Sequence, residues 1–516
     1  MSSSRFATAF NVASAIVTLG VQMAVSFFLS GFLVATLGEE ANGFTQLANN
    51  FVSYASLVTL AFNSMGQRFI STAFHRGELD KAGSYYSTLV VCDIALCAVF
   101  LPIAALVVGN LGSIVEMGNA SLPDVQLLFA FVFANFGANL FVSLLCSAMF
   151  VMNRVYIQNA VNLARNVLNA CALLFLYATL EPHVHYVSLV SLALTVISIP
   201  VCAAIKSRLL PEVRFSFRAF SGAAVRGLTS SGIWNTVNQC GNMLMTGFDL
   251  LLANWFAGAG PMGLLSVAKT MPNAIITLAS TLNSNLEPEL VIAYAKGGTA
   301  GIIDRLRFDI RLSNLIVSVP IAVFCALSVP FYELWMPSLD AVELSALSFL
   351  TIMAYIPWAG LQVLYNVFTA TNHLKVNSVA FCTGSVLNVA LVLALLSCTD
   401  LGVYAIAGTS SAITIVRSLI VTAPYVAGLL GIRKRELYRE VGISLACFVM
   451  VVCISTIAAS IVGTSGWVHL VATIALSCLL GWLLVLLATF GSDGRKRAMR
   501  LASSAFHCKS KRRLKE

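Results

Sequence analysis

Residues 263–290 read GLLSVAKTMPNAIITLASTLNSNLEPEL, and this segment combines the two features that decide the fold of the chain. It is long and apolar enough to form a membrane helix, yet polar side chains recur along it every three or four residues. Side chains at that spacing share one face of a helix. Pro272 lacks a backbone N–H, so we also expect a kink beside Lys269 that frees a carbonyl group. The polar face comprises Lys269, Asn273, Thr277, Ser280, Ser284 and Glu287.

The rest of the chain has the composition of a polytopic membrane protein. Of its 516 residues, 58% are hydrophobic and 10% are charged, whereas soluble proteins have about 25% charged residues. Apolar runs recur that can each cross about 30 Å of hydrocarbon as a helix. They are too long for barrel strands, so we predict an all-α membrane protein with about fourteen transmembrane helices. The predicted spans are 11–38, 43–74, 83–108, 124–151, 156–180, 185–205, 229–257, 261–295, 308–333, 343–371, 374–397, 401–431, 441–463 and 467–490.

Lysine and arginine occupy only alternate loops, which predicts the orientation. The loops GEEANG (38–43), EPHVHY (181–186) and MPSLDAVE (336–343) contain neither residue, whereas Lys or Arg lies in or beside every intervening loop and the tail carries nine of them. The positive-inside rule therefore places both termini in the cytoplasm. The net charge of +9 follows from this topology, so no nucleic-acid partner is expected. Anionic membrane lipids are the expected partner of the basic tail at 492–516.

The motifs of enzymes and metal proteins are missing from the sequence. There is no phosphate-binding loop, no Ser/His/Asp nucleophile set and no CxxC pair among the 13 cysteines. His183 and His185 could bind a metal from outside, but a plain polar loop is the favoured interpretation. We therefore predict a protein that is not an enzyme, with no metal site and no cofactor. A carrier or a channel remains.

The two halves of the chain show signs of a repeat. A shift of 220 residues pairs Gly43 with Gly263 and the Asn-Ser at 63–64 with the Asn-Ser at 283–284. The same shift serves two successive helices and their loop. Both halves begin on the same side of the membrane, so the repeat is parallel, with its axis along the membrane normal.

Polar stripes like that of 263–290 also occur on five other predicted helices. One interpretation is that these residues hydrogen-bond between helices, at about 1 kcal/mol each. Full-length stripes on six helices favour the alternative, a water-filled central cavity. The residues predicted to line it are Asn49, Asn162, Asn166, Asn238, Asn242, Asn273, Gln362 and Asn366.

Five charged residues lie deep within predicted spans: Arg165, Lys269, Arg417, Asp93 and Asp249. Each costs roughly 2.5–3.5 kcal/mol on insertion scales, and ionisable residues at this depth are candidates for function. A structural ion pair between Asp249 and Lys269 is the alternative for those two residues.

Two segments give the chain a resemblance to bacterial polysaccharide flippases. They are NGFTQLANNFVSYASLVTLAFNSMGQRFISTAFHRGELDKAGSYYSTLV (42–90) and 231–290, which begins SGIWNTVNQCGNMLMTGFDLLLANWF. That family belongs to the multidrug/oligosaccharidyl-lipid/polysaccharide exporter superfamily. The resemblance implies two pseudo-symmetric six-helix lobes around a central cavity, plus two C-terminal helices. The implied parts are an N-lobe at 1–205, a C-lobe at 228–432, extra helices at 433–491 and the tail at 492–516. The residues between the lobes predict a cytoplasmic amphipathic linker at 206–227, in which Arg214 and Arg218 lie four apart among phenylalanines and favour an interfacial helix.

The resemblance also implies a function. Such flippases move undecaprenyl-pyrophosphate-linked oligosaccharides, the precursors of O-antigen in lipopolysaccharide, of capsule and of exopolysaccharide, across the bacterial cytoplasmic membrane by alternating access. By role, Arg165, Lys269 and Arg417 would bind the pyrophosphate, because guanidinium and ammonium groups suit phosphate. Asp93 and Asp249 would couple transport to proton or sodium entry. A polysaccharide polymerase and glycosyltransferases are the expected protein partners.

Three kinds of alternative remain open. A multidrug exporter of the same superfamily has the same shape but often favours an acidic cavity. A lipid II flippase and a teichoic acid exporter are near relatives with similar substrates. An integral-membrane glycosyltransferase or polymerase is the alternative from a different class. It usually needs a large external loop or an acidic catalytic motif, and the sequence has neither.

Overall fold

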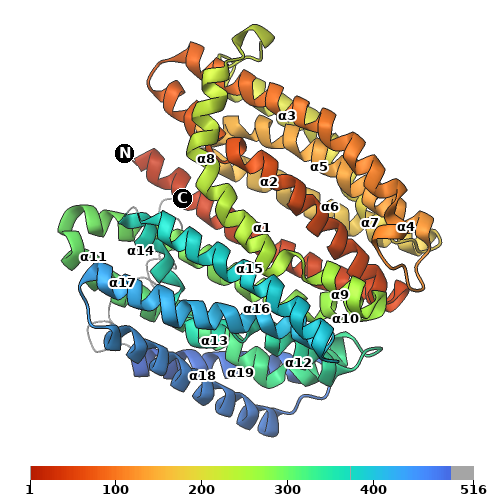
Figure 1. Ribbon diagram of the computed structural model, residues 1–516, viewed down its shortest axis with the longest axis vertical. Coiled ribbons are helices and arrows are strands. Elements are labelled where there is room, and N and C mark those ends of the chain that lie inside the picture. The colour runs from red at the N-terminus through yellow and green to blue at the C-terminus, as the bar shows by residue number, and fades with distance from the viewer. Residues whose placement is uncertain (1, 372, 490–516) are drawn as a thin grey trace, which may run out of the picture. The chain divides into compact units, whose positions relative to one another are not determined.

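The protein is helical throughout the part that its computed structural model describes, residues 2–371 and 373–489 (Figure 1). It separates into two compact units, Met1–Val267 and Ala268–Glu516. The basic tail at 492–516 lies outside the described residues, so its contact with anionic lipid stays a prediction.

The first unit consists mainly of long helices packed side by side. Helix α5 packs along α7, α2 along α8, and α1 along α6. Ile70, Tyr86, Leu89 and Leu144 belong to one of its buried apolar clusters. The elements are α1 (Ser2–Leu37), α2 (Glu39–His75), α3 (Leu79–Gly109), α4 (Leu111–Ile114), α5 (Leu122–Val151), α6 (Val155–Thr179), α7 (Tyr186–Leu209), η1 (Phe217–Ala219), α8 (Gly222–Asn242), η2 (Met243–Gly247), α9 (Asp249–Ala257) and α10 (Ala259–Ala268).

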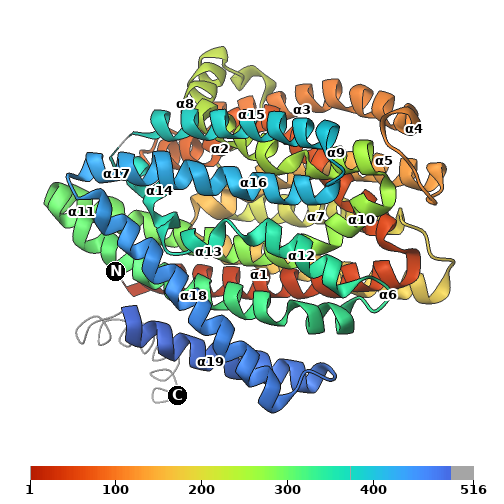
Figure 2. The same cartoon turned by 60° about the horizontal axis from the view of Figure 1, so that its bottom comes forward.

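The second unit contains more interrupted helices. Helix α11 packs against α12, α18 and α19, and α18 lies beside α19 (Figure 2). The elements are α11 (Thr270–Trp335), α12 (Ala341–Ile352), α13 (Tyr355–Trp358), η3 (Leu361–Val363), α14 (Leu364–Ala370), α15 (Leu374–Cys398), α16 (Val403–Arg417), η4 (Ser418–Thr422), α17 (Ala423–Leu430), α18 (Lys434–Val462) and α19 (Trp467–Thr489).

The predicted class is confirmed, and the number of spans stays a prediction. Ten described helices are long and apolar enough to cross a membrane, and the bent pair Ala259–Ala268 with Thr270–Tyr294 gives up to eleven. Three other predicted spans, 43–74, 229–257 and 343–371, are helical but do not pass that test. The first carries a polar stripe, and the other two are divided into shorter helical pieces.

Two predicted spans join in a way that the sequence did not indicate. The spans 261–295 and 308–333 were expected to be separated by a loop, but α11 covers the connection. The backbone leaves helical geometry at Gly298, where φ is 59°. Glycine tolerates this left-handed conformation without steric cost. Gly301 also lies close to the chain before the bend, because a Cβ there would sit 2.6 Å from the carbonyl oxygen of Ala293.

Two glycines that the 220-residue shift pairs lie against each other in the first unit. A Cβ atom on Gly43 would lie 2.9 Å from the Cα of Gly263, and one on Gly263 would lie 2.5 Å from the backbone of Glu39. A residue can touch its own repeat partner only near the axis that relates the repeats. This contact therefore supports the twofold repeat inferred from the sequence.

The predicted amphipathic helix in the linker 206–227 is wrong. Helix α7 continues to Leu209, Pro211 follows, and a single helical turn, η1, precedes α8. Side chains of α3 hold this segment as a loop. Ser87 Oγ and Thr88 Oγ1 accept hydrogen bonds from the backbone N–H groups of Ser216 and Ser221, at 3.1 and 3.2 Å. Phe215, Phe217 and Phe220 are exposed on the loop.

The two compact units do not coincide with the two predicted lobes. The contacts place α8, α9 and α10 in the first unit, whereas the predicted C-lobe begins at residue 228. The lobes 1–205 and 228–432 were inferred from the sequence repeat, whereas the compact units are defined by contacts between residues. The lobe boundaries therefore stay a prediction.

Candidate functional site

Arg417 has the surroundings expected of a buried anion-binding residue. It ends α16, directly before the π-helical turn η4, and is 8% exposed. Its Nη2 donates to the hydroxyl of Tyr365 at 2.9 Å. Its guanidinium carbon lies 4.7 Å from the ring centre of Phe381 and 5.5 Å from that of Tyr365. Among the described residues Nε has no hydrogen-bond partner, and no carboxylate pairs with the guanidinium.

Amide side chains lie on the same broken helix as Tyr365, the hydrogen-bond partner of this arginine. Asn283 of α11 donates to Oε1 of Gln362 at 2.8 Å, and Asn366 donates to the backbone oxygen of Asn283 at 2.8 Å. Gln362 lies in η3, and Tyr365 and Asn366 in α14, so the broken helix 341–370 supplies three of the polar groups. We call this set the Arg417 cluster: Arg417, Tyr365, Gln362, Asn366 and Asn283.

The polar stripe of α11 leads along the helix toward this cluster. Asn273, Thr277, Ser280 and Ser284 are exposed. The hydroxyls of Thr277, Ser280 and Ser284 donate to carbonyl oxygens of their own helix at 2.7–2.9 Å. For these three hydroxyls the interpretation as bonds between helices is wrong. The exposed face can meet water or a polar ligand.

The predicted kink beside Lys269 is confirmed, and its freed carbonyl has replacement donors. Helix α10 ends at Ala268, and α11 begins at Thr270 with Pro272 in its first turn. The oxygen of Ala268 accepts from Ser348 Oγ at 2.7 Å and from the hydroxyl of Tyr332 at 3.4 Å. Lys269 sits at the break and is 9% exposed.

Arg165 in the first unit is already engaged with its neighbours. Its Nη2 donates to Thr195 of α7 at 2.9 Å, and its Nη1 donates to Asn139 of α5 at 3.4 Å. Arg165 therefore links α6 to two other helices, as a structural residue does. Its predicted contact with phosphate would require these bonds to open.

Asp93 is a fully buried carboxylate on α3. It is 0% exposed, and Asn63 of α2 donates to its Oδ1 at 3.0 Å. Its Oδ2 has no hydrogen-bond partner among the described residues. An ionised carboxylate is costly to bury without a positive partner, so this position favours a proton or a bound cation. The 220-residue shift pairs Asn63 with Asn283 of the Arg417 cluster.

Asp249 follows an irregular turn of its helix. It is 3% exposed and begins α9, after the π-helical segment η2. The carbonyl oxygen of Gly247 in η2 accepts from Tyr54 at 2.6 Å and from Asn50 at 3.1 Å. π-Helical turns within α-helices often mark functional positions, and both Asp249 and Arg417 adjoin one.

The remaining predicted cavity residues of the first unit differ in their exposure. Asn49 and Asn242 are exposed, and Asn162, Asn166 and Asn238 are half-buried. On α6, Asn159 donates to Ser14 of α1 at 2.9 Å. The interhelical interpretation therefore applies at one end of the α6 stripe, and the lining role of these five residues stays a prediction.

Sequence reasoning missed several residues of these sites. Tyr365 lies three positions after Gln362 and could have been noticed from that helical spacing. Asn283 lies beside the stripe of α11 but off its exposed face. Asp309 was overlooked in a predicted span, although it is 0% exposed and its carboxylate lies 2.8 Å from Nε of Arg305, four residues earlier.

Comparisons with known proteins agree on the architecture. No protein-family model matches the chain. An inward-facing multidrug resistance MATE family transporter of the MOP superfamily has a similar structure, with a TM-score of 0.68, 13% identity, and coverage of 82% of this chain and 99% of that one. The lipid II flippase MurJ, in an inward closed conformation, has a TM-score of 0.65, 12% identity, and coverage of 92% and 98%. This chain has the same fold as that MATE transporter and MurJ.

One curated sequence is also similar. It is an uncharacterized membrane protein, EpsK, of Bacillus subtilis (strain 168), which is 28% identical over 461 residues, or 87% of this chain and 89% of that protein.

The likeness to the MATE transporter structure confirms the predicted two-lobed helical fold. The structural neighbours reported above are a transporter and a flippase, whereas the rival glycosyltransferase or polymerase would be an enzyme.

Proposed function

We propose that this protein is a flippase that moves undecaprenyl-pyrophosphate-linked oligosaccharides across the bacterial cytoplasmic membrane by alternating access. The observation that carries the proposal is Arg417, buried with a free Nε and no carboxylate partner among the described residues. A buried cation is stable only if something compensates its charge, and here two aromatic rings do so in part. An anionic substrate group would complete that compensation.

The chemistry of the Arg417 cluster matches the two polar parts of such a substrate. A guanidinium presents several N–H donors in one plane, which suits phosphate oxygens. The amides of Gln362, Asn366 and Asn283 both donate and accept, as sugar hydroxyls require. The exposed hydroxyls and amide on α11 extend this polar surface along the helix.

The likeness to a lipid II flippase fits the same proposal. That protein's name states a lipid-linked substrate, and the proposed substrate differs from lipid II in the sugar part. The polyprenyl chain would remain in lipid while the head group crosses. With no phosphate-binding loop in the sequence, the proposed energy source is proton or sodium entry, with Asp93 as the coupling residue.

A multidrug exporter is the second candidate, because a MATE transporter shares the fold and Asp93 is a buried acid. A cationic drug would bind an acidic site. Arg417, without an acidic partner in the described chain, favours an anionic ligand instead.

The test is a translocation assay with purified protein in liposomes. Undecaprenyl pyrophosphate carrying a short labelled oligosaccharide is placed in one leaflet, and its arrival in the other is measured with an impermeant glycosidase. Lipid II and a cationic dye are run in parallel. We expect the oligosaccharide lipid to move at least tenfold faster in these liposomes than in liposomes that contain the lipid but no protein. Movement of only lipid II, or of only the dye, would assign the protein to the corresponding alternative and overturn the proposal.

A further inference from the structure

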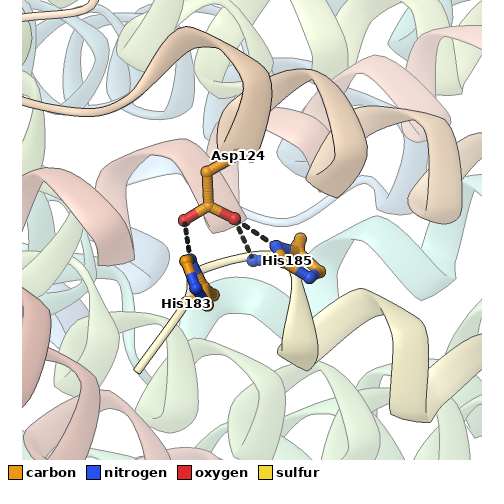
Figure 3. A group of neighbouring side chains, drawn as sticks. All are labelled: Asp124, His183 and His185. Atoms are coloured by element: carbon orange, nitrogen blue, oxygen red, sulfur yellow. Dashed lines mark hydrogen bonds and ion pairs between the residues drawn. The ribbon is translucent and has the colours of Figure 1, made fainter. Parts of the chain in front are cut away.

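Two histidines and an aspartate converge where the start of α5 meets the loop before α7 (Figure 3). Asp124 lies in the first turn of α5, and His183 and His185 lie in the loop before α7. Their ligand atoms all lie within 4.8 Å of one another. Nδ1 of His185 contacts Oδ1 of Asp124, and Nδ1 of His183 lies 3.6 Å from Oδ2.

These distances suit a shared metal ion. Two donor atoms bound to one tetrahedral Zn²⁺ at 2.0–2.2 Å lie about 3.4 Å apart. The separation between His183 Nδ1 and Asp124 Oδ2 is close to that value. Nδ1 of His185 and Oδ1 of Asp124 must move apart to the same separation when the ion enters between them. Both Nδ1 atoms face the carboxylate, so one ion between the three side chains can be reached without rotating either ring.

The backbone holds the site in place before any ion binds. The N–H groups of Val184 and His185 donate to the two oxygens of Asp124 at 2.9 and 3.2 Å. The hydroxyl of Tyr177, near the end of α6, donates to the carbonyl oxygen of His183 at 2.9 Å. Each carboxylate oxygen keeps a lone pair for a metal. Such supporting bonds are typical of metal sites, where they orient the ligands.

The surroundings combine shielding with access. The side chains of Asp124 and His185 are 14% and 16% exposed, whereas that of His183 is 44% exposed. The ring of Tyr186 packs against both histidine rings, at 4.8 and 5.5 Å between centres. An ion can therefore enter past His183, and water can occupy the position that the protein leaves open.

We propose that Asp124, His183 and His185 form a binding site for a divalent transition-metal ion, with Zn²⁺ as the best match. Two imidazoles and one carboxylate form a ligand set that occurs in zinc sites with an open position. The sequence favoured a plain polar loop for the two histidines, and it is the packing of α5 against α7 that brings Asp124 to them. Binding would fasten the loop 181–185 to the start of α5, independently of which substrate the protein transports.

The experiment measures Zn²⁺ binding to the full-length protein in detergent, purified without a histidine tag and stripped with a chelator. Isothermal titration should show one saturable site per chain. His183→Ala should weaken binding at least about tenfold. This variant leaves the contacts of Asp124 with His185 and Val184 in place, so it should fold. His469→Ala is the matched control, because His469 is an exposed histidine on another helix, and it should bind like the unaltered protein.

X-ray absorption at the zinc edge identifies the ligands in the unaltered protein. Nitrogen and oxygen neighbours with imidazole scattering would support the proposal. Sulfur neighbours would mean that Zn²⁺ binds adventitiously to some of the 13 cysteines, and the proposal would fail. Absence of saturable binding, or equal affinity in His183→Ala, would overturn it as well.

Discussion

The hydroxyl of Ser348 donates a hydrogen bond to the carbonyl oxygen of Ala268 at 2.7 Å. In a continuous helix that oxygen would accept from the residue four positions later, but Pro272 has no N–H to give. The hydroxyl of Tyr332, which is fully buried, lies 2.6 Å from Ser348 Oγ and adds a second polar group at the break. The interruption beside Lys269 is thus stabilised from α12 and from the far end of α11.

Ser348→Ala should therefore destabilise the protein. The variant removes the shorter of the two hydrogen bonds to this buried carbonyl and leaves only the longer one from Tyr332. A hydrogen bond contributes about 0.5–1.5 kcal/mol, so the thermal unfolding midpoint in detergent should fall by a few degrees. Ser397→Ala is the control, because Ser397 is exposed and its hydrogen bonds stay within its own helix. Pro272→Ala supplies the missing N–H and should recover much of the loss in the double variant. An unchanged midpoint in Ser348→Ala would show that this bond does not support the break.

Arg417 gives a prediction about transport. Arg417→Ala should reduce translocation of the lipid-linked oligosaccharide at least tenfold, because the only guanidinium of the Arg417 cluster is lost. Arg417→Lys keeps the charge but loses the planar set of donors, so it should retain only part of the activity. Membrane abundance, measured by immunoblot, should stay near normal in both.

Arg307→Ala is the matched control for Arg417. Arg307 also belongs to the second unit, but it is about half exposed and pairs with Glu436 at 2.7 Å. An exposed ion pair contributes about 0–1 kcal/mol, so this variant should transport normally. If Arg307→Ala and Arg417→Ala lowered transport equally, the special role of Arg417 would be refuted.

Asp93 gives a prediction about coupling. Asp93→Asn keeps the shape and can still accept from Asn63, but it cannot take up a proton or balance a cation. Transport by this variant should no longer respond to an imposed proton or sodium gradient, whereas equilibration without a gradient should persist. The measurement compares translocation rates in liposomes with and without each gradient. A variant that still responds fully would remove Asp93 from the mechanism.

The sequence predicted the helical class and the deep charged residues because both leave local signals. Apolar length and the spacing of polar residues can be read directly from 263–290. The partners of those residues could not be read in this way. Arg417 meets Tyr365 only because the predicted span 343–371 is broken into several short helices, and Asp124 meets the two histidines only through packing of α5 on α7. Contacts between distant segments depend on tertiary packing, which leaves no periodic signal.

The orientation inferred from the loops can be tested by cysteine labelling. Single cysteines at Asn110 and Asp340, in loops without Lys or Arg, should react with an impermeant reagent in intact cells. Cysteines at Gly77 and at Ser492, the latter outside the described residues, should react only after permeabilisation. The physical reason is the retention of Lys and Arg on the cytoplasmic side. A reversed result at any of the four positions would overturn the predicted topology.

Lys269 gives the last prediction, because its position joins the helix break to the polar face of α11. It is 9% exposed and caps α11 one turn before Asn273, the first exposed residue of the stripe. A lysine in that position can meet an anionic group that moves along the stripe, as a point charge rather than a bidentate donor. Lys269→Ala should abolish translocation at normal membrane abundance, and Lys269→Arg should keep part of it. Lys296→Ala, which alters an exposed lysine of the same helix, should transport normally.

The alternative inferred from the sequence, a structural ion pair between Lys269 and Asp249, predicts a different result for the double variant. Removing both charges, in Lys269→Ala with Asp249→Ala, would then restore transport, because no unbalanced charge would remain buried. Rescue in the same assay would refute the phosphate role of Lys269, and continued loss would support it.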